Sequence, residues 1–170
     1  MVVGVGILHG WRFCPRCGAG GAPRGGSFEC LKCGYVAWSN SVPGVHALIE
    51  QDGRILLGRR AFDPGAGCWG LPGGFLEEGE APDVGLRREV REETGLDVEP
   101  GELFGIWMQP HGDRTVLCLL WSARLLGGVE QAADDVLELG WFGPEELPAD
   151  IGPSAFSDAL SLWRARHEHP

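Results

Sequence analysis

From residue 42 onward, short apolar runs alternate with polar turns in the pattern that favours β-strands. Gln51, Asp52 and Gly53 separate the first two runs, and an Asp-Gly pair between apolar segments is a strong hairpin signal. The predicted strands, which are rich in apolar, β-branched and aromatic residues, are residues 45–50, 54–60, 104–109, 115–124 and 139–142. We therefore predict a sheet whose first two strands form a hairpin.

A first helix is predicted over residues 82–94. Pro82 suits the first turn of a helix, and Gly95 suits the position just after the last turn. Leu86 and Val90 form an apolar stripe that can pack against the sheet.

A second helix is predicted over residues 155–167, with Ser154 as its N-cap. Its core-facing positions are Phe156, Ala159, Leu160 and Trp163. Together these patterns predict a mixed sheet with a helix on either side.

Glu89, Glu92 and Glu93 fall within one narrow sector of the first helix, because successive residues are 100° apart. Like charges at this spacing repel one another by about 0.2–0.5 kcal/mol per pair. Gly85 lies in the same sector one turn earlier and costs about 1 kcal/mol relative to alanine. We therefore expect another backbone to approach the helix closely at Gly85.

Two interpretations of this acidic sector are open. A solvated face with ion pairs such as Arg88–Glu92 is the common explanation for a charged helix. It leaves unexplained why the carboxylates gather on one side, just after a Pro-Gly-Gly turn. An oxygen-ligand site for Mg²⁺ or Mn²⁺ that meets a phosphate substrate explains both features.

The first 38 residues differ from the rest because they are rich in glycine and cysteine. Cys14 and Cys17, then Cys30 and Cys33, form two identical Cys-x-x-Cys-Gly turns. Four thiolates satisfy tetrahedral Zn²⁺ without an open position, which is typical of a structural site. Disulfides and a redox-active pair are the alternatives, but a cytosolic chain disfavours the first and the repeated motif disfavours the second. We predict a zinc ribbon at residues 1–40 and a second domain at residues 41–170.

The net charge of −10 over 170 residues is unevenly distributed. Residues 1–40 carry a net charge of +3, so the other 130 residues carry −13. An acidic body argues against sequence-independent binding of nucleic acid, although the basic ribbon leaves that partner open. No apolar run reaches the roughly 18 residues of a membrane helix, and the first residues do not resemble a signal peptide. We expect a cytoplasmic protein that does not interact with membranes.

One sequence motif resembles a known family closely. Gly74, then five residues, Glu80, then seven residues, and then residues 88–96 (REVREETGL) match every fixed position of the Nudix box. The likeness to Nudix hydrolases extends from residue 42 to about residue 165, and the cysteine module resembles the zinc ribbon of the NADH pyrophosphatase branch. The resemblance implies a Nudix α/β/α sandwich with a mixed sheet, and cation-dependent hydrolysis of a nucleoside diphosphate linked to another moiety.

The resemblance also implies roles for individual residues. Glu89, Glu92 and Glu93 would bind the catalytic Mg²⁺ or Mn²⁺ together with the carbonyl of Gly73. Arg88 would orient a metal-binding glutamate. Glu80 would maintain the geometry of the loop and helix and assist a metal-bound water.

Other roles fall outside the box. Asp135 or Glu138, just before the Trp-Phe pair, is the candidate general base, and plain solvation of an acidic loop is the alternative. Arg60, Trp107 and His111 are candidate substrate-binding residues. The chain departs from the family pattern at residues 107–112 (WMQPHG), where NADH pyrophosphatases carry a longer array. It also has Gly85 where relatives usually have alanine.

The predicted function is a pyrophosphohydrolase for ADP-ribose, NAD(H) or FAD-like substrates, acting with Mg²⁺ or Mn²⁺ beside a structural Zn²⁺. A hydrolase of (deoxy)nucleoside triphosphates or of RNA caps is the nearest alternative. A non-catalytic regulator that senses ADP-ribose and binds nucleic acid through its ribbon is the other. The predicted partners are the nucleotide substrate and a second copy of the chain in a homodimer.

Overall fold

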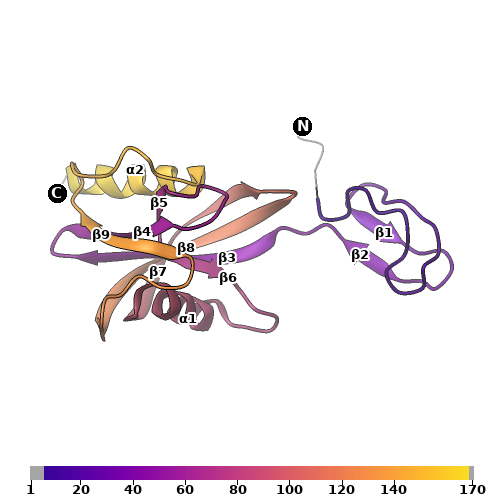
Figure 1. Ribbon diagram of the computed structural model, residues 1–170, viewed down its shortest axis with the longest axis horizontal. Helices are drawn as coiled ribbons and strands as arrows, with labels where there is room; N and C mark the ends of the chain where they lie inside the picture. The colour runs from indigo at the N-terminus through magenta and orange to yellow at the C-terminus, as the bar shows by residue number, and fades with distance from the viewer. Residues whose placement is uncertain (1–5, 169–170) are drawn as a thin grey trace. The chain divides into compact units, whose positions relative to one another are not determined.

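The computed structural model describes residues 6–168 and divides into two compact units (Figure 1). One unit comprises the described residues up to Val42 together with Pro110–Val116. The other comprises Pro43–Gln109 and the chain from Leu117 onward. The predicted boundary between residues 40 and 41 stays a prediction, and the two units are described separately below.

The N-terminal unit contains a small antiparallel hairpin, formed by β1 (Ser27–Glu29) and β2 (Val36–Trp38). Its core is built around Phe28, which is fully buried together with Leu8, Cys14 and Cys30. The ring of Trp11 packs edge-on against Phe28, with 5.6 Å between the ring centroids. So few apolar residues cannot stabilise a domain alone, which makes the four cysteines important for this unit.

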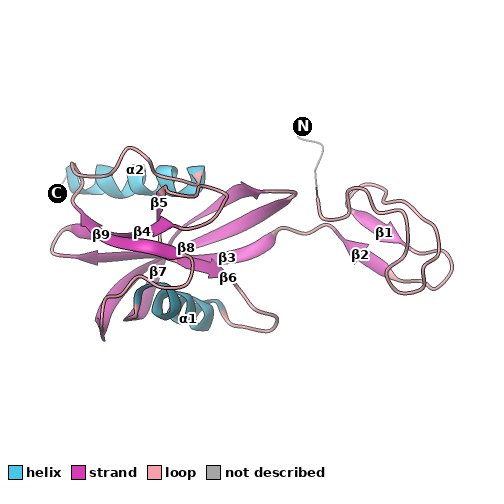
Figure 2. Cartoon of the chain, in the orientation of Figure 1, coloured by secondary structure: helices cyan, strands magenta, loops and turns pink. Residues whose placement is uncertain are grey.

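The second unit is built on a seven-stranded sheet with one helix on each face (Figures 1 and 2). The strand order is β5-β4-β3-β8-β7, with β6 paired to β3 and β9 paired to β4. The strands are β3 (Val42–Gln51), β4 (Arg54–Arg60), β5 (Trp69–Gly70), β6 (Gly73–Phe75), β7 (Leu96–His111), β8 (Arg114–Gly128) and β9 (Val136–Phe142). A parallel bridge between Trp69 and Ile151 accompanies antiparallel pairs such as β3–β4, and the predicted α/β/α sandwich with a mixed sheet is confirmed.

The first hairpin forms where the sequence predicts it. Asp52 and Gly53 both have positive φ, 53° and 72°, and they join Gln51 to its partner Arg54. Two positive φ angles characterise the type I′ turn, whose twist matches that of the two strands.

Helix α1 (Pro82–Thr94) has the predicted bounds. Pro82 opens it, and Gly95 ends it in the left-handed conformation, where its N–H donates to the Arg91 carbonyl. Leu86 and Val90 are fully buried against sheet residues such as Val45. The acidic side of the helix is therefore held in a fixed orientation relative to the sheet.

Helix α2 (Ser154–Glu168) covers the opposite face of the sheet (Figure 2). Phe156, Ala159, Leu160 and Trp163 are all buried, as their spacing predicts. Within residues 6–168, neither helix has the length and apolar content that a membrane-spanning segment requires.

The short strands β5 and β6 were not predicted. Strand β6 pairs with β3 so that Gly73 lies opposite His46 and Gly74 lies opposite Val45. This pairing brings the Pro-Gly-Gly turn next to α1, and it positions the candidate site.

Candidate functional site

The three glutamates of α1 differ in their exposure. Residue Glu93 is 4% exposed, the side chain of Glu89 is 12% exposed, and that of Glu92 is 51% exposed. A solvated acidic face would expose all three carboxylates. Because two of them are largely buried, the carboxylates are held in place by the surrounding structure, as in a binding site.

Arg88 connects this acidic face to the preceding loop through five hydrogen bonds. Its guanidinium donates to both carboxylate oxygens of Glu80, at 2.8 and 2.9 Å. It also donates to Glu89 at 2.8 Å, to Glu92 at 3.1 Å and to the backbone carbonyl of Phe75 at 3.1 Å. Because a guanidinium has five N–H donors in a rigid plane, this arrangement fixes the relative positions of three carboxylates.

These contacts shift the ionisation of the acids. Hydrogen bonds from Arg88, and one from the N–H of Glu77, lower the pKa of Glu80 to about 2, so Glu80 remains ionised. Glu80 and Glu89 in turn raise the pKa of Arg88. Burial raises the pKa of Glu89, since its hydrogen bond to Arg88 does not fully compensate for lost solvation.

Glu93 is held from a different direction. Its carboxylate accepts a hydrogen bond of 2.7 Å from the N–H of Gly73 on β6. Burial raises its pKa well above the usual range, and a hydrogen bond with the Asp135 carboxyl adds to the effect. Acidic groups whose pKa values are raised by burial and by one another favour a bound cation, and oxygen ligands of this kind suit Mg²⁺ or Mn²⁺.

Of the candidate residues outside the Nudix box, the structure brings Asp135 and Arg60 close to Glu93. Both line a narrow cleft that also includes Glu93, and the nearby Asp135 carboxyl helps to raise the pKa of Glu93. Glu138 instead lies 3.5 Å from Arg59 in an exposed ion pair.

The two predicted substrate contacts, Trp107 and His111, stay predictions. Trp107 stacks on Phe104 of the same strand, with 6.4 Å between ring centroids and 22° between planes. His111 belongs to the Pro110–Val116 segment, which groups with the N-terminal unit.

Gly85 is explained by side chains rather than by a backbone. A Cβ at this position would collide with Leu76 and would lie 2.8 Å from a carboxylate oxygen of Glu80. The expectation that another backbone approaches Gly85 is therefore wrong. The ends of the Leu76 and Glu80 side chains occupy the space next to Gly85, and both would have to shift to accommodate a methyl group.

His46 is a buried residue of the site that the sequence analysis missed. Residue His46 is 7% exposed, and its ring packs edge-on against Phe156 of α2 with 4.8 Å between centroids. Burial and the charge of Arg60 lower its pKa to about 3, against an opposing hydrogen bond with the Leu71 backbone. A single histidine in an apolar strand gives no sequence signal, since most such residues belong to the core.

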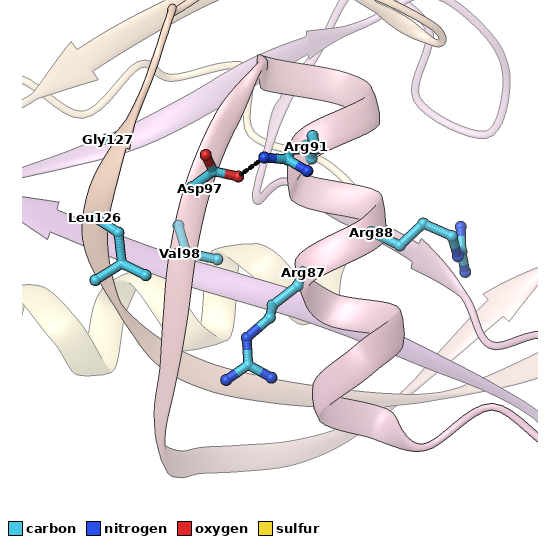
Figure 3. Close-up of a pocket in the computed structure, with 7 residues that line it drawn as sticks. All are labelled: Arg87, Arg88, Arg91, Asp97, Val98, Leu126 and Gly127. Atoms are coloured by element: carbon cyan, nitrogen blue, oxygen red, sulfur yellow. Dashed lines mark ion pairs between the residues drawn. The ribbon is translucent and has the colours of Figure 1, made fainter.

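A cavity of about 410 Å³ lies on the other side of α1 (Figure 3). Arg87 and Arg91 point toward it from the helix, whereas the side chain of Arg88 points away, and each of the three is paired with carboxylates. Arg87 binds Asp83 and Glu99, while Arg91 binds Asp97 on β7. These pairs compensate the positive charge, so the cavity is not a strong anion site.

The cysteines of the N-terminal unit converge. The sulfur atoms of Cys14, Cys17, Cys30 and Cys33 all lie within 4.8 Å of one another, and none forms a disulfide. Two Sγ–Sγ distances are 3.7 Å (Cys14–Cys33) and 3.6 Å (Cys17–Cys30). Backbone N–H groups of Cys33 and Lys32 lower the pKa of Cys30 to about 6, which favours the thiolate that metals require. This group therefore has the ligand type and spacing of a metal centre.

Comparison with known proteins identifies the family. The NUDIX domain model matches residues 40–160, more than half of the chain. The chain belongs to the Nudix hydrolase family. The solved structure of a NUDIX hydrolase from Nitrosomonas europaea superimposes with a TM-score of 0.82 and 30% identity, covering 94% of this chain and 93% of that one.

Sequence relatives of this Nudix hydrolase carry several names. A MutT-like protein of Streptomyces ambofaciens is 40% identical over 72% of this chain and 77% of its own length. The ADP-ribose pyrophosphatase of Methanocaldococcus jannaschii is 35% identical, over 67% of this chain and 69% of its own. An NAD-capped RNA hydrolase of Stutzerimonas stutzeri is 31% identical over 81% of this chain, but only half of that protein is covered. These relatives identify a pyrophosphohydrolase without fixing its substrate.

The space at Gly85 leads to a first prediction. Replacing Gly85 with alanine should by itself stabilise the helix by about 1 kcal/mol. The new methyl group, however, would clash with the side chains of Glu80 and Leu76. We expect kcat of the G85A variant to fall by about tenfold, because Glu80 and Arg88 would shift. The measurement is a steady-state assay with a nucleotide that the wild-type protein hydrolyses.

The control is V84A, which changes an exposed neighbour on the same helix and should leave kcat within twofold. If G85A is as active as the wild type, the space at Gly85 is not needed for the Glu80–Arg88 pair to function.

Proposed function

We propose that this Nudix hydrolase cleaves the diphosphate of a nucleoside diphosphate linked to a second moiety, with ADP-ribose as the leading substrate and NAD(H) and FAD as others. The proposal depends on the acidic group of α1, by which we mean Glu89, Glu92 and Glu93. Arg88 binds the first two of these carboxylates, and the Gly73 amide binds the third. The relative named ADP-ribose pyrophosphatase, with two thirds of its length covered, supports this substrate class.

In this proposal, Glu89, Glu92 and Glu93 hold Mg²⁺ or Mn²⁺ together with the Gly73 carbonyl. The cation supplies charge neutralisation for the diphosphate and lowers the pKa of a water molecule. Arg88 and Glu80 keep the three ligands in position, because the five hydrogen bonds of Arg88 leave it little freedom.

Asp135 is the general base that the geometry favours. It lines the same narrow cleft as Glu93 and helps to raise the pKa of that carboxyl, whereas Glu138 lies beside Arg59 at an exposed edge. Arg60 lines the same cleft as Asp135, and its guanidinium suits a phosphate oxygen of the substrate.

A hydrolase of NAD-capped RNA is the second candidate. The relative with that name aligns with 81% of this chain at 31% identity. An NAD cap contains the same kind of diphosphate. Hydrolysis of a nucleoside triphosphate would use the same acidic group. A regulator that only senses ADP-ribose is disfavoured, because binding alone does not require the full set of acids and Arg88.

We also propose that the four cysteines bind one structural Zn²⁺. Zn–S bonds of about 2.3 Å in a tetrahedron place sulfur atoms about 3.8 Å apart. The Sγ–Sγ distances of 3.6 and 3.7 Å are close to this value.

The function is tested with a panel of ADP-ribose, NADH, FAD, NAD-capped RNA and dNTPs in Mg²⁺ or Mn²⁺, with products identified by mass spectrometry. We expect ADP-ribose to give AMP and ribose 5-phosphate. The E93Q variant should lose at least a thousandfold in kcat, because it removes a charge from the acidic group. In the same assay, D135N should lose far more activity than E138Q.

The matched control is D83N, which removes an acid from the same helix outside the acidic group, where it pairs with Arg87. Its activity should stay within twofold of the wild type. Full activity of E93Q would refute the site, and equal losses in D135N and E138Q would refute the choice of base.

The four-cysteine site leads to a prediction about zinc content. The purified protein should contain one zinc per chain by elemental analysis, and C30S should lose it because a three-thiolate site binds more weakly. The control C68S, outside the cluster, should keep its zinc. Zinc-free wild-type protein with a folded N-terminal unit would contradict the assignment.

A further inference from the structure

His46 has an unusual combination of burial and incomplete hydrogen bonding. Its Nδ1 atom is buried and has no hydrogen-bond partner among the described residues. The nearby Leu71 backbone favours the protonated ring and partly offsets the fall in its pKa. An apolar side chain of similar size would avoid the unpartnered nitrogen, so the retained histidine calls for a functional explanation.

The imidazole lies against the segment that carries Gly73. His46 pairs with Gly73 across the β3–β6 ladder, and the next residue, Ala47, donates its N–H to the Pro72 carbonyl at 2.8 Å. A Cβ on Gly73 would lie 3.0 Å from Nδ1 and would collide with the carbonyl oxygen of Val45. The ring therefore lies directly against Gly73, while the backbone of the next residue holds Pro72.

The same ring is held in turn by helix α2. Phe156 packs edge-on against His46, and it also lies where a side chain on Gly70 would go, 3.0 Å from that Cβ position. The imidazole is thus confined between α2 and residues 70–73. It cannot rotate away without disturbing either side.

The Gly73 amide is the group that this arrangement controls. Its N–H donates to Glu93 at 2.7 Å, and Gly73 has a φ of 137°, which only glycine adopts readily. We propose that His46 is a positioning residue, whose ring, packed between Phe156 and Gly73, keeps the Gly73 backbone and the Glu93 carboxylate in the geometry of the cation site. This inference rests on the proposed function of Glu93 and Gly73 as cation ligands.

The test compares two polar replacements of similar character. The side chain in H46Q extends to the position of Nε2 and fills much of the space between Phe156 and Gly73, whereas that in H46N is shorter and leaves part of this space empty. We expect H46N to lose about 10–100-fold in kcat and to bind Mn²⁺ several-fold more weakly, as for other residues that orient metal ligands. H46Q should stay within about fivefold of the wild type in both measurements, and KM should change by less than threefold in either variant.

Binding of Mn²⁺ is measured by electron paramagnetic resonance without substrate, so this readout does not depend on finding the right nucleotide. W121F is the matched control, because it removes the other buried unpartnered nitrogen of the described residues, on β8. Its Mn²⁺ binding and kcat should match the wild type.

Equal losses in H46Q and H46N, or wild-type Mn²⁺ affinity in H46N, would overturn the positioning role. If the wild-type protein cleaves no substrate of the panel, the proposed function fails. The difference in Mn²⁺ binding between H46Q and H46N still decides the role of His46 in that case.

Discussion

The candidate site depends on one side chain, the guanidinium of Arg88. It joins Glu80 in the loop before α1 to Glu89 and Glu92 on the helix, and it also binds the Phe75 carbonyl at the end of β6. Without it, two largely buried carboxylates would lose the cation with which they pair, and leaving buried charge uncompensated is strongly destabilising. Arg88 therefore allows the chain to fold with these carboxylates close together, as the proposed cation site requires.

The fold supplies the second support. The apolar stripe of α1 orients its acidic side toward β6, and the β3–β6 pairing brings the Gly73 amide to Glu93. The carboxylates are thus fixed by a helix and by a strand that are far apart in sequence. Such rigid support is what a catalytic constellation needs, since small displacements of a ligand are costly to the rate.

Local signals in the sequence predicted much of this arrangement. Pro82 and Gly95 defined α1, Asp52-Gly53 defined the hairpin, and the fixed spacing of the Nudix box predicted the family. Strands β5 and β6 were missed because two or three residues carry no periodic pattern. The proximity of Asp135 to Glu93, the role of Gly85 and the burial of His46 depend on tertiary contacts, which neighbouring residues in the sequence do not reveal.

The central claim is that the acidic side of α1, with the Gly73 carbonyl, binds the divalent cation. Crystals soaked in Mn²⁺ and measured at the manganese absorption edge test it most directly. We expect an anomalous peak bounded by Glu89, Glu92, Glu93 and the Gly73 carbonyl, and no such peak in crystals of the E93Q variant. A strong manganese peak elsewhere, with none at these residues in the wild-type protein, would contradict it.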